Sequence, residues 1–161
     1  MAENYLLAPQ NIQVSSTIKE IEHCNEITAP YALFLSLSQA KALANTHAAT
    51  LRRSNRVEFR GGTIQKIIKA FYTSPFLWQS NYVDVIAALI DAFYEYKNET
   101  LDELCDDELI TLMRKHFDET CRGSVDLLVG RDLYKIAHNI RFGITDYADI
   151  QDEEEIAYDI D

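Results

Sequence analysis

Apolar side chains in this chain recur at helical spacing, and this periodicity is the feature that most constrains its fold. The cleanest series is Ile64, Ile67, Ile68, Phe71 and Tyr72, at positions i, i+3, i+4, i+7 and i+8. A helix turns once in about 3.6 residues, so these side chains form one stripe that must be buried against a partner. The segment is therefore predicted to be a helix packed on other helices rather than a strand.

Other segments follow the same rule. A stripe of buried residues is predicted on a helix that begins at Ser38: Ala40, Leu43, Ala44, His47 and Leu51. Asn81 is predicted to cap a helix that runs to about Lys97, and its apolar residues cover more than one face, which is typical of a central helix. Three more helices are predicted: from Ser15–Thr17 to about Ile27, from Asp106 or Asp107 through Phe117, and from Ser124 to Ile140 with a break at Gly130.

These patterns predict an all-α fold, a single compact helical bundle-like domain of five or six helices spanning residues 1–142. Residues 143–161 are predicted to form an acidic C-terminal tail. One short β-ribbon is allowed over Arg56–Arg60, where charged and apolar residues alternate before Gly61 and Gly62. The apolar run from Tyr31 to Leu37 fits either a strand or a buried lead-in to the next helix.

Most of the net charge of −11 lies in the tail. Eight of the 26 Asp and Glu residues lie in 143–161, which has no Lys or Arg, whereas residues 1–142 hold 18 acids against all 15 bases. Isoleucine and tyrosine residues alternate with these acids, a pattern that suits a segment that orders on a basic, partly apolar surface. One hypothesis is that the tail docks on the region Arg52–Lys69 of its own or a neighbouring chain, or on another protein.

Composition excludes several classes. No apolar run is long enough for a membrane span, and the N-terminus lacks the basic and apolar stretches of a secretion signal. Three cysteines are too few, and odd in number, for a disulfide framework. We therefore expect a cytoplasmic protein with free thiols and no membrane partner.

A basic cluster is the first candidate site. Its members, predicted as a charged contact face, are Arg52, Arg53, Arg56, Arg60, Lys66 and Lys69. These cations could bind nucleic acid, an acidic partner or the tail, but solvation or pairing with acids of the body is the favoured interpretation. If the helix from Asn81 entered a DNA groove, it would carry Asp84, Asp91 and Glu95 against the phosphates, so nucleic acid is not favoured.

Aromatic residues gather around Pro75, between the two predicted helices that flank it. They are Tyr72, Phe76, Trp78 and Tyr82. Sealing of the core is the favoured role, and contact with a protein partner through Trp78 and Tyr82 is the alternative.

Residues that could bind metals or catalyse a reaction give weaker patterns. The carboxylates between Asp102 and Glu108 lack the glycine turn of a calcium loop, so helix capping explains them better. Cys105, His116 and Cys121 lack zinc-ligand spacing. No metal, cofactor or catalytic residue is therefore predicted. Whether these three side chains meet in space is left open, as is an enzyme pocket in which His47 faces a carboxylate or a thiol.

The neighbouring residues predict whether three of the histidines are buried or exposed. His47 lies on an apolar stripe and is predicted to be a hydrogen-bonded core histidine. His116 and His138 stand beside basic residues and are predicted to lie on the surface.

Short motifs between Arg56 and Ile140 resemble a family of uncharacterised proteins from clostridial-type Firmicutes. They are Arg56-Val57-Glu58-Phe59, Ser74-Pro75, Phe93-Tyr94 with Lys97-Asn98-Glu99, Asp107-Glu108-Leu109-Ile110 with Met113 and Phe117, and Gly123-Ser124 with Leu127-Leu128. The resemblance implies a bacterial cytosolic protein of unknown function. It supplies no activity, cofactor or catalytic residue.

The sequence thus favours a non-enzymatic accessory or regulatory protein that acts by protein–protein interaction, with another protein or a second copy as partner. A nucleic-acid-binding protein that uses Arg52–Lys69 is the first alternative. A small enzyme or metal-binding protein that uses His and Cys residues is the second.

Overall fold

The computed structural model describes residues 2–58 and 62–143, with side chains from residue 14 onward. Its main helices are α1 (Ala2–Thr28), α2 (Leu37–Arg53), α3 (Gly62–Phe71), α4 (Tyr82–Glu99), α5 (Asp106–Glu119), α6 (Val125–Leu127) and α7 (Leu133–Arg141). A short 3-10 turn, η1 (Ala29–Tyr31), follows α1, and a π-helical turn, η2 (Leu128–Asp132), joins α6 to α7. The described residues contain no strand, and the predicted all-α fold is confirmed.

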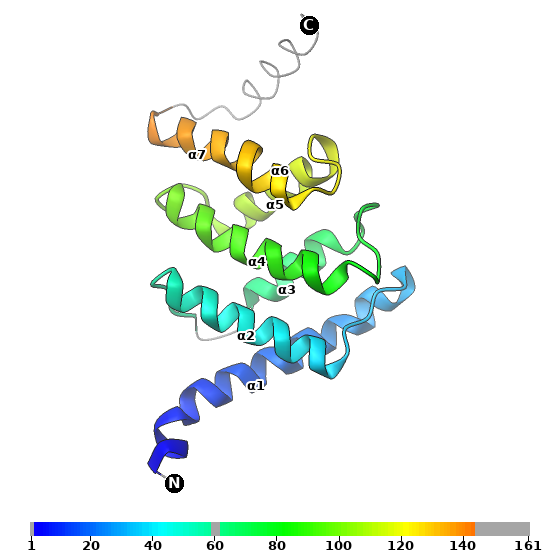
Figure 1. Cartoon of the computed structure of the whole chain (residues 1–161), viewed down its shortest axis with the longest axis vertical. Helices are drawn as coiled ribbons and strands as arrows, with labels where there is room; N and C mark the ends of the chain where they lie inside the picture. Colours follow the sequence, from blue (N-terminus) through cyan, green and yellow to red (C-terminus); the bar gives the residue numbers. More distant parts are fainter. Residues whose placement is uncertain (1, 59–61, 144–161) are drawn as a thin grey trace, which may run out of the picture.

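The helices are arranged in two layers. Helices α1, α2, α4 and α7 lie one above another, and α3 and α5 lie behind them (Figure 1). Helix α4 contacts α2, α3, α5, α6 and α7. The prediction that α4 is the central helix is therefore confirmed, and its apolar residues on several faces are explained by neighbours on several sides.

The predicted stripes form the core between the layers. Ile64, Ile67, Ile68 and Phe71 of α3 are fully buried, and the predicted positions of α2, including His47, are buried as well. Burial of each large apolar side chain contributes about 1.5–3 kcal/mol relative to exposure, so these stripes hold the layers together.

Several helix boundaries differ from the predictions. Helix α1 begins at Ala2, so the predicted start at Ser15–Thr17 is wrong: the weak backbone preferences of Ser and Thr do not break an established helix. Helix α2 is capped by Ser36. Its hydroxyl accepts from the backbone N–H of Gln39, and the side-chain oxygen of Gln39 accepts from the backbone N–H of Ser36. The side chain of Asn81 does not cap α4 but bonds back into the preceding link.

Other predictions fall at the edges of the described chain. Residues 56–58 form no strand, whereas Phe59, Arg60 and Gly61 lie outside the described residues. The predicted acidic tail also lies outside them, apart from Gly143. At Gly130 the chain does not break but widens into the π-helical turn, which continues directly into α7. Within the described part of the chain, no helix is both long and apolar enough to cross a membrane.

Candidate functional site

Two links between helices carry no charge, although charged residues make up 25% of the chain. Residues 27–40, which run from the end of α1 into the start of α2, contain no Asp, Glu, Lys or Arg, and neither do residues 70–83, which run from the end of α3 into the start of α4. Both links lie at the right of Figure 1, at the same side of the stack. The fold therefore brings two uncharged stretches, far apart in sequence, to one surface.

Side-chain amides hold the first link in place. The Gln79 side chain accepts from the backbone N–H of Phe34 and donates to its carbonyl, both at 2.8 Å. On the other side, the Asn25 side chain makes the same pair of bonds to Leu35, both at 2.9 Å. The extended segment is thus held as a strand would be, with two amide side chains in place of neighbouring strands.

The link exposes alternate side chains. Leu33 and Leu35 are buried, whereas Tyr31 and Leu37 are 54% exposed and Phe34 is 57% exposed. From the second link, Trp78 is 58% exposed, and its backbone N–H donates to Oδ1 of Asn81 at 2.7 Å. We refer to the exposed side chains Tyr31, Phe34, Leu37 and Trp78 as the aromatic surface.

The rings around Pro75 divide between core and surface. Tyr31 packs edge-on against half-buried Tyr72, with ring centroids 5.0 Å apart, and Phe76 packs against Phe117 in the core. Tyr82 is 1% exposed, and burial raises its pKa to about 12. Of the two residues predicted as aromatic contacts, Trp78 therefore lies on the surface and Tyr82 lies in the core.

Most of the described members of the basic cluster are paired with acids. Arg53 lies 2.8 Å from Asp91, and Lys66 lies 3.1 Å from Asp107, whose hydrogen bond and charge raise the lysine pKa. Arg52 and Lys69 are exposed, and Arg60 lies outside the described residues.

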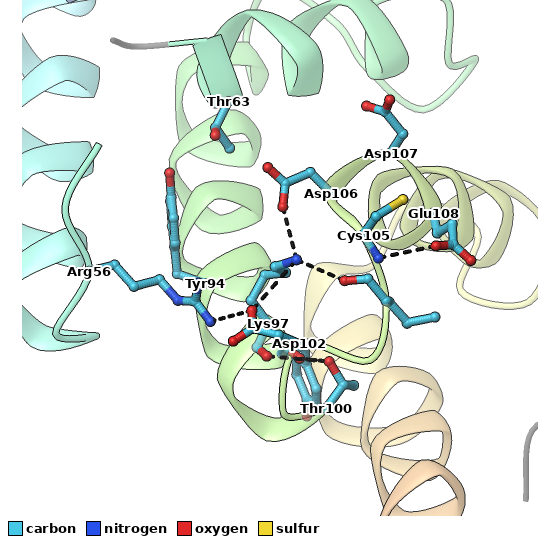
Figure 2. Close-up of polar contacts among 12 residues, drawn as sticks. Arg56, Thr63, Tyr94, Lys97, Thr100, Asp102, Cys105, Asp106, Asp107 and Glu108 are labelled. Carbon is cyan, nitrogen blue, oxygen red and sulfur yellow. Dashed lines mark hydrogen bonds and ion pairs between the residues drawn. The ribbon is translucent and has the colours of Figure 1, made fainter. Parts of the chain in front are cut away.

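Figure 2 shows that the remaining member of the basic cluster, Arg56, shares the carboxylate of Asp102 with a second cation, Lys97. Arg56 donates to Oδ1 of Asp102 at 2.7 Å, and this bond holds the pKa of Asp102 below its usual value. Buried Lys97 lies 3.6 Å from the same oxygen and 3.0 Å from Asp106, and it donates to the Leu104 carbonyl at 2.7 Å. Of the carboxylates that resembled a calcium loop, Asp102, Asp106 and Asp107 are therefore engaged by the protein's own cations, and Glu108 accepts from the backbone N–H of Cys105 at the start of α5.

His47 is buried and hydrogen-bonded, as predicted. Its Nε2 lies 3.0 Å from Oε2 of Glu58 and 3.0 Å from the Tyr94 hydroxyl, while Tyr94 and Thr63 both donate to Oε1 of Glu58. Burial alone would raise the pKa of Glu58, but the hydrogen bonds from His47, Tyr94 and Thr63 outweigh it and lower the pKa. The carboxylate is thus ionised and fully engaged, which does not suit a general base.

The prediction that His116 lies on the surface is wrong, because Asp132 binds it in the core. Its Nδ1 lies 2.8 Å from Oδ2 of Asp132, which also accepts from the Thr120 hydroxyl and from the Cys121 thiol, the latter at 3.4 Å. Arg131 donates to the other oxygen at 2.7 Å. Burial, followed by the charge of Asp132, raises the pKa of Cys121 to about 11. A protonated thiol that donates to a carboxylate is the opposite of an activated nucleophile.

The structure brings His116 and Cys121 together at the end of α5, whereas Cys105 lies at its exposed beginning. Among the described residues, no group of three or more His, Cys, Asp and Glu side chains has a geometry that could hold a metal ion.

The fold and the site define an all-α protein in which two uncharged links, joined by hydrogen bonds, expose aromatic side chains at one side of the helical stack. The chain belongs to the family described as "Family of unknown function (DUF6323)", whose match covers residues 20–146. The comparison with curated proteins and the comparison with solved structures each gave no match.

Sequence reasoning missed Tyr31 and Phe34 as surface residues. The signal that could have found them is the absence of charge from 27–40 and 70–83, since the centre of a protein interface is depleted of charged residues.

Proposed function

We propose that this protein is a non-enzymatic accessory or regulatory protein of the cytoplasm that binds another protein through its aromatic surface. The observation that carries the proposal is the pair of hydrogen bonds between Gln79 and Phe34, which ties two uncharged links into one surface. Exposed aromatic residues without nearby charge are the usual anchors of an interface. Because the links are already fixed, little conformational entropy is lost on binding.

The charge pairing supports a protein partner over nucleic acid. Affinity for nucleic acid comes from cations that neutralise phosphates, and Arg53, Arg56 and Lys66 already neutralise carboxylates of the same chain. The two buried histidines likewise support binding over catalysis, because the carboxylates they contact are fully engaged by several donors.

Photo-crosslinking tests the proposal. A benzophenone amino acid replaces Trp78 in the full chain, expressed in the organism that encodes it, and the matched control places the same group at Tyr134, an equally exposed ring on α7. We expect a discrete adduct with one protein at position 78 and none at 134. The substitution Phe34→Ser should reduce the adduct at 78 without changing the circular dichroism spectrum.

Crosslinking of the purified protein distinguishes a second copy of the chain from a different protein as the partner. An adduct of twice the chain mass that forms in purified protein identifies a second copy, whereas an adduct formed only in cells identifies a different protein. The same adducts at 78 and 134, or no adduct at 78, would show that the aromatic surface is not an interface.

A further inference from the structure

A cavity of about 640 Å³ opens between the middle of α1, at Val14 and Thr17, and the second half of α2. The two helices separate toward the left of Figure 1, where α1 begins and α2 ends. Ala44, Ala48 and Ala49 line the α2 side, and Val14 and Val57 add apolar walls from α1 and from the segment after α2. The alanine side chains are short and occupy little of the space beside α2.

Polar and charged residues also line the cavity. His47 and Glu58 are in its wall, but the Glu58 carboxylate already accepts from three donors of the protein. Arg56 also lines the cavity, and its charge is compensated by Asp102. Arg52 lines it too and, among the described residues, forms no ion pair with an acid. The wall thus holds the ionised Glu58, whose oxygens are occupied by donors of the protein, and Arg52, a cation that has no acidic partner among the described residues.

We propose that this cavity binds a small amphipathic carboxylate, whose apolar body lies against Ala44, Ala48 and Val57 and whose carboxylate pairs with Arg52. The volume falls within the usual range for small-molecule sites. A guanidinium group recognises a carboxylate through two parallel hydrogen bonds, which an uncharged amide cannot reproduce with equal strength. Because the chain as a whole carries a charge of −11, a preference for an acid over its amide requires a specific cationic site.

Four acids, each paired with its own amide, test the inference on the full-length protein: benzoate, 4-hydroxybenzoate, hexanoate and octanoate. Binding is measured by saturation-transfer NMR and by calorimetry. We expect at least one acid to bind about tenfold or more tightly than its amide, because it alone forms a charge-assisted pair. Arg52→Gln should remove that preference, whereas Lys41→Gln, the same charge change at an exposed position of α2, should keep it.

A second variant, Ala48→Leu, tests the cavity by filling it. Ala48→Leu keeps a strong helix former on α2 and occupies the alanine wall, so binding of the acid should fall at least tenfold while the helical spectrum is unchanged. Trp78→Ala should leave binding of the acid unchanged, which separates this site from the aromatic surface. The inference is overturned if no acid is preferred over its amide, or if Arg52→Gln and Ala48→Leu bind as the wild type does.

Discussion

Gln79 and Phe34 exchange two hydrogen bonds of 2.8 Å across a separation of 45 residues. Each bond uses a backbone group of Phe34 that would otherwise be satisfied by water, so the link before α2 is fixed to the link before α4. The aromatic surface is therefore a product of tertiary structure: its side chains come from two segments, and one glutamine determines how the segments meet.

Replacement of Gln79 by alanine should loosen this surface. The variant loses two partly exposed hydrogen bonds, and we expect the free energy of unfolding to fall by about 1–2 kcal/mol, as measured by urea denaturation. Gln65→Ala, on α3, is the matched control and should change stability by less than about 0.5 kcal/mol. The photo-adduct at position 78 should weaken in Gln79→Ala alone, and equal effects of the two substitutions would contradict the role of Gln79.

The hydrogen bonds that Glu58 accepts from His47, Thr63 and Tyr94 should make the stability of the protein depend on pH. The pKa of Glu58 is lower in the folded protein than its ordinary value of 4.5, so its stabilisation is present above that value and is lost as the pH falls through the lower, folded-state pKa. Glu58→Gln should destabilise the protein by about 1–3 kcal/mol at pH 7, because hydrogen bonds to a charged acceptor are weakened. The difference between the two proteins should narrow below pH 4.5.

Urea denaturation at a series of pH values measures this difference. Glu22→Gln, at an exposed position of α1, supplies the control for the change in net charge. A destabilisation by Glu58→Gln that stays constant as the pH falls well below 4.5, where the carboxylate of the unfolded chain protonates, would show that its charge is not involved.

The helices were predictable because their evidence is local. Spacings of three and four residues identified the buried faces of α2 and α3, and apolar residues on several faces identified α4 as central. Contacts between residues that are far apart in the sequence produce no such local pattern. Nothing near Gln79 in the sequence indicates that its amide binds the backbone of Phe34.

The surface prediction for His116 failed for a related reason. Its sequence neighbours Arg114 and Lys115 point in other directions around α5, so their charge says nothing about its burial. The spacing was informative: Leu109, Met113 and His116 fall on one helical stripe, and all three are buried. Only the fold, however, could show that Asp132 is the partner that makes burial of this histidine tolerable.

The three thiols should react at very different rates. Cys105 is exposed, Cys24 and Cys121 are buried, and burial raises the pKa of both buried thiols, that of Cys121 to about 11. Since the thiolate is the reactive form, iodoacetamide at pH 8 should modify Cys105 first and the other two only slowly. Peptide mapping by mass spectrometry over time measures the three rates. In urea the rates should become similar, and fast labelling of native Cys121 would contradict its burial beside Asp132.

Among the glycines that the structure describes, Gly123 is the one at which a side chain would meet the closest contact. Its φ is +85°, and a Cβ there would lie 2.6 Å from Cβ of Phe76, a ring that packs on Phe117. Gly143 offers a matched comparison, since its φ is +80° and no described atom lies within 4 Å of such a Cβ. Both alanine variants lose about 1 kcal/mol from the left-handed backbone conformation.

Gly123→Ala should therefore lose about 1–3 kcal/mol more than Gly143→Ala, because only the first forces the Phe76 side chain and its neighbours to move. Urea denaturation of both variants measures the difference. Adding Phe76→Gly to each variant isolates the clash, because glycine also lacks the Cβ that the new methyl group would meet. That second substitution should be less destabilising in the Gly123→Ala background than in the Gly143→Ala background. Equal losses in the two backgrounds would show that backbone conformation alone, and not the approach of Phe76, explains why glycine is needed at position 123.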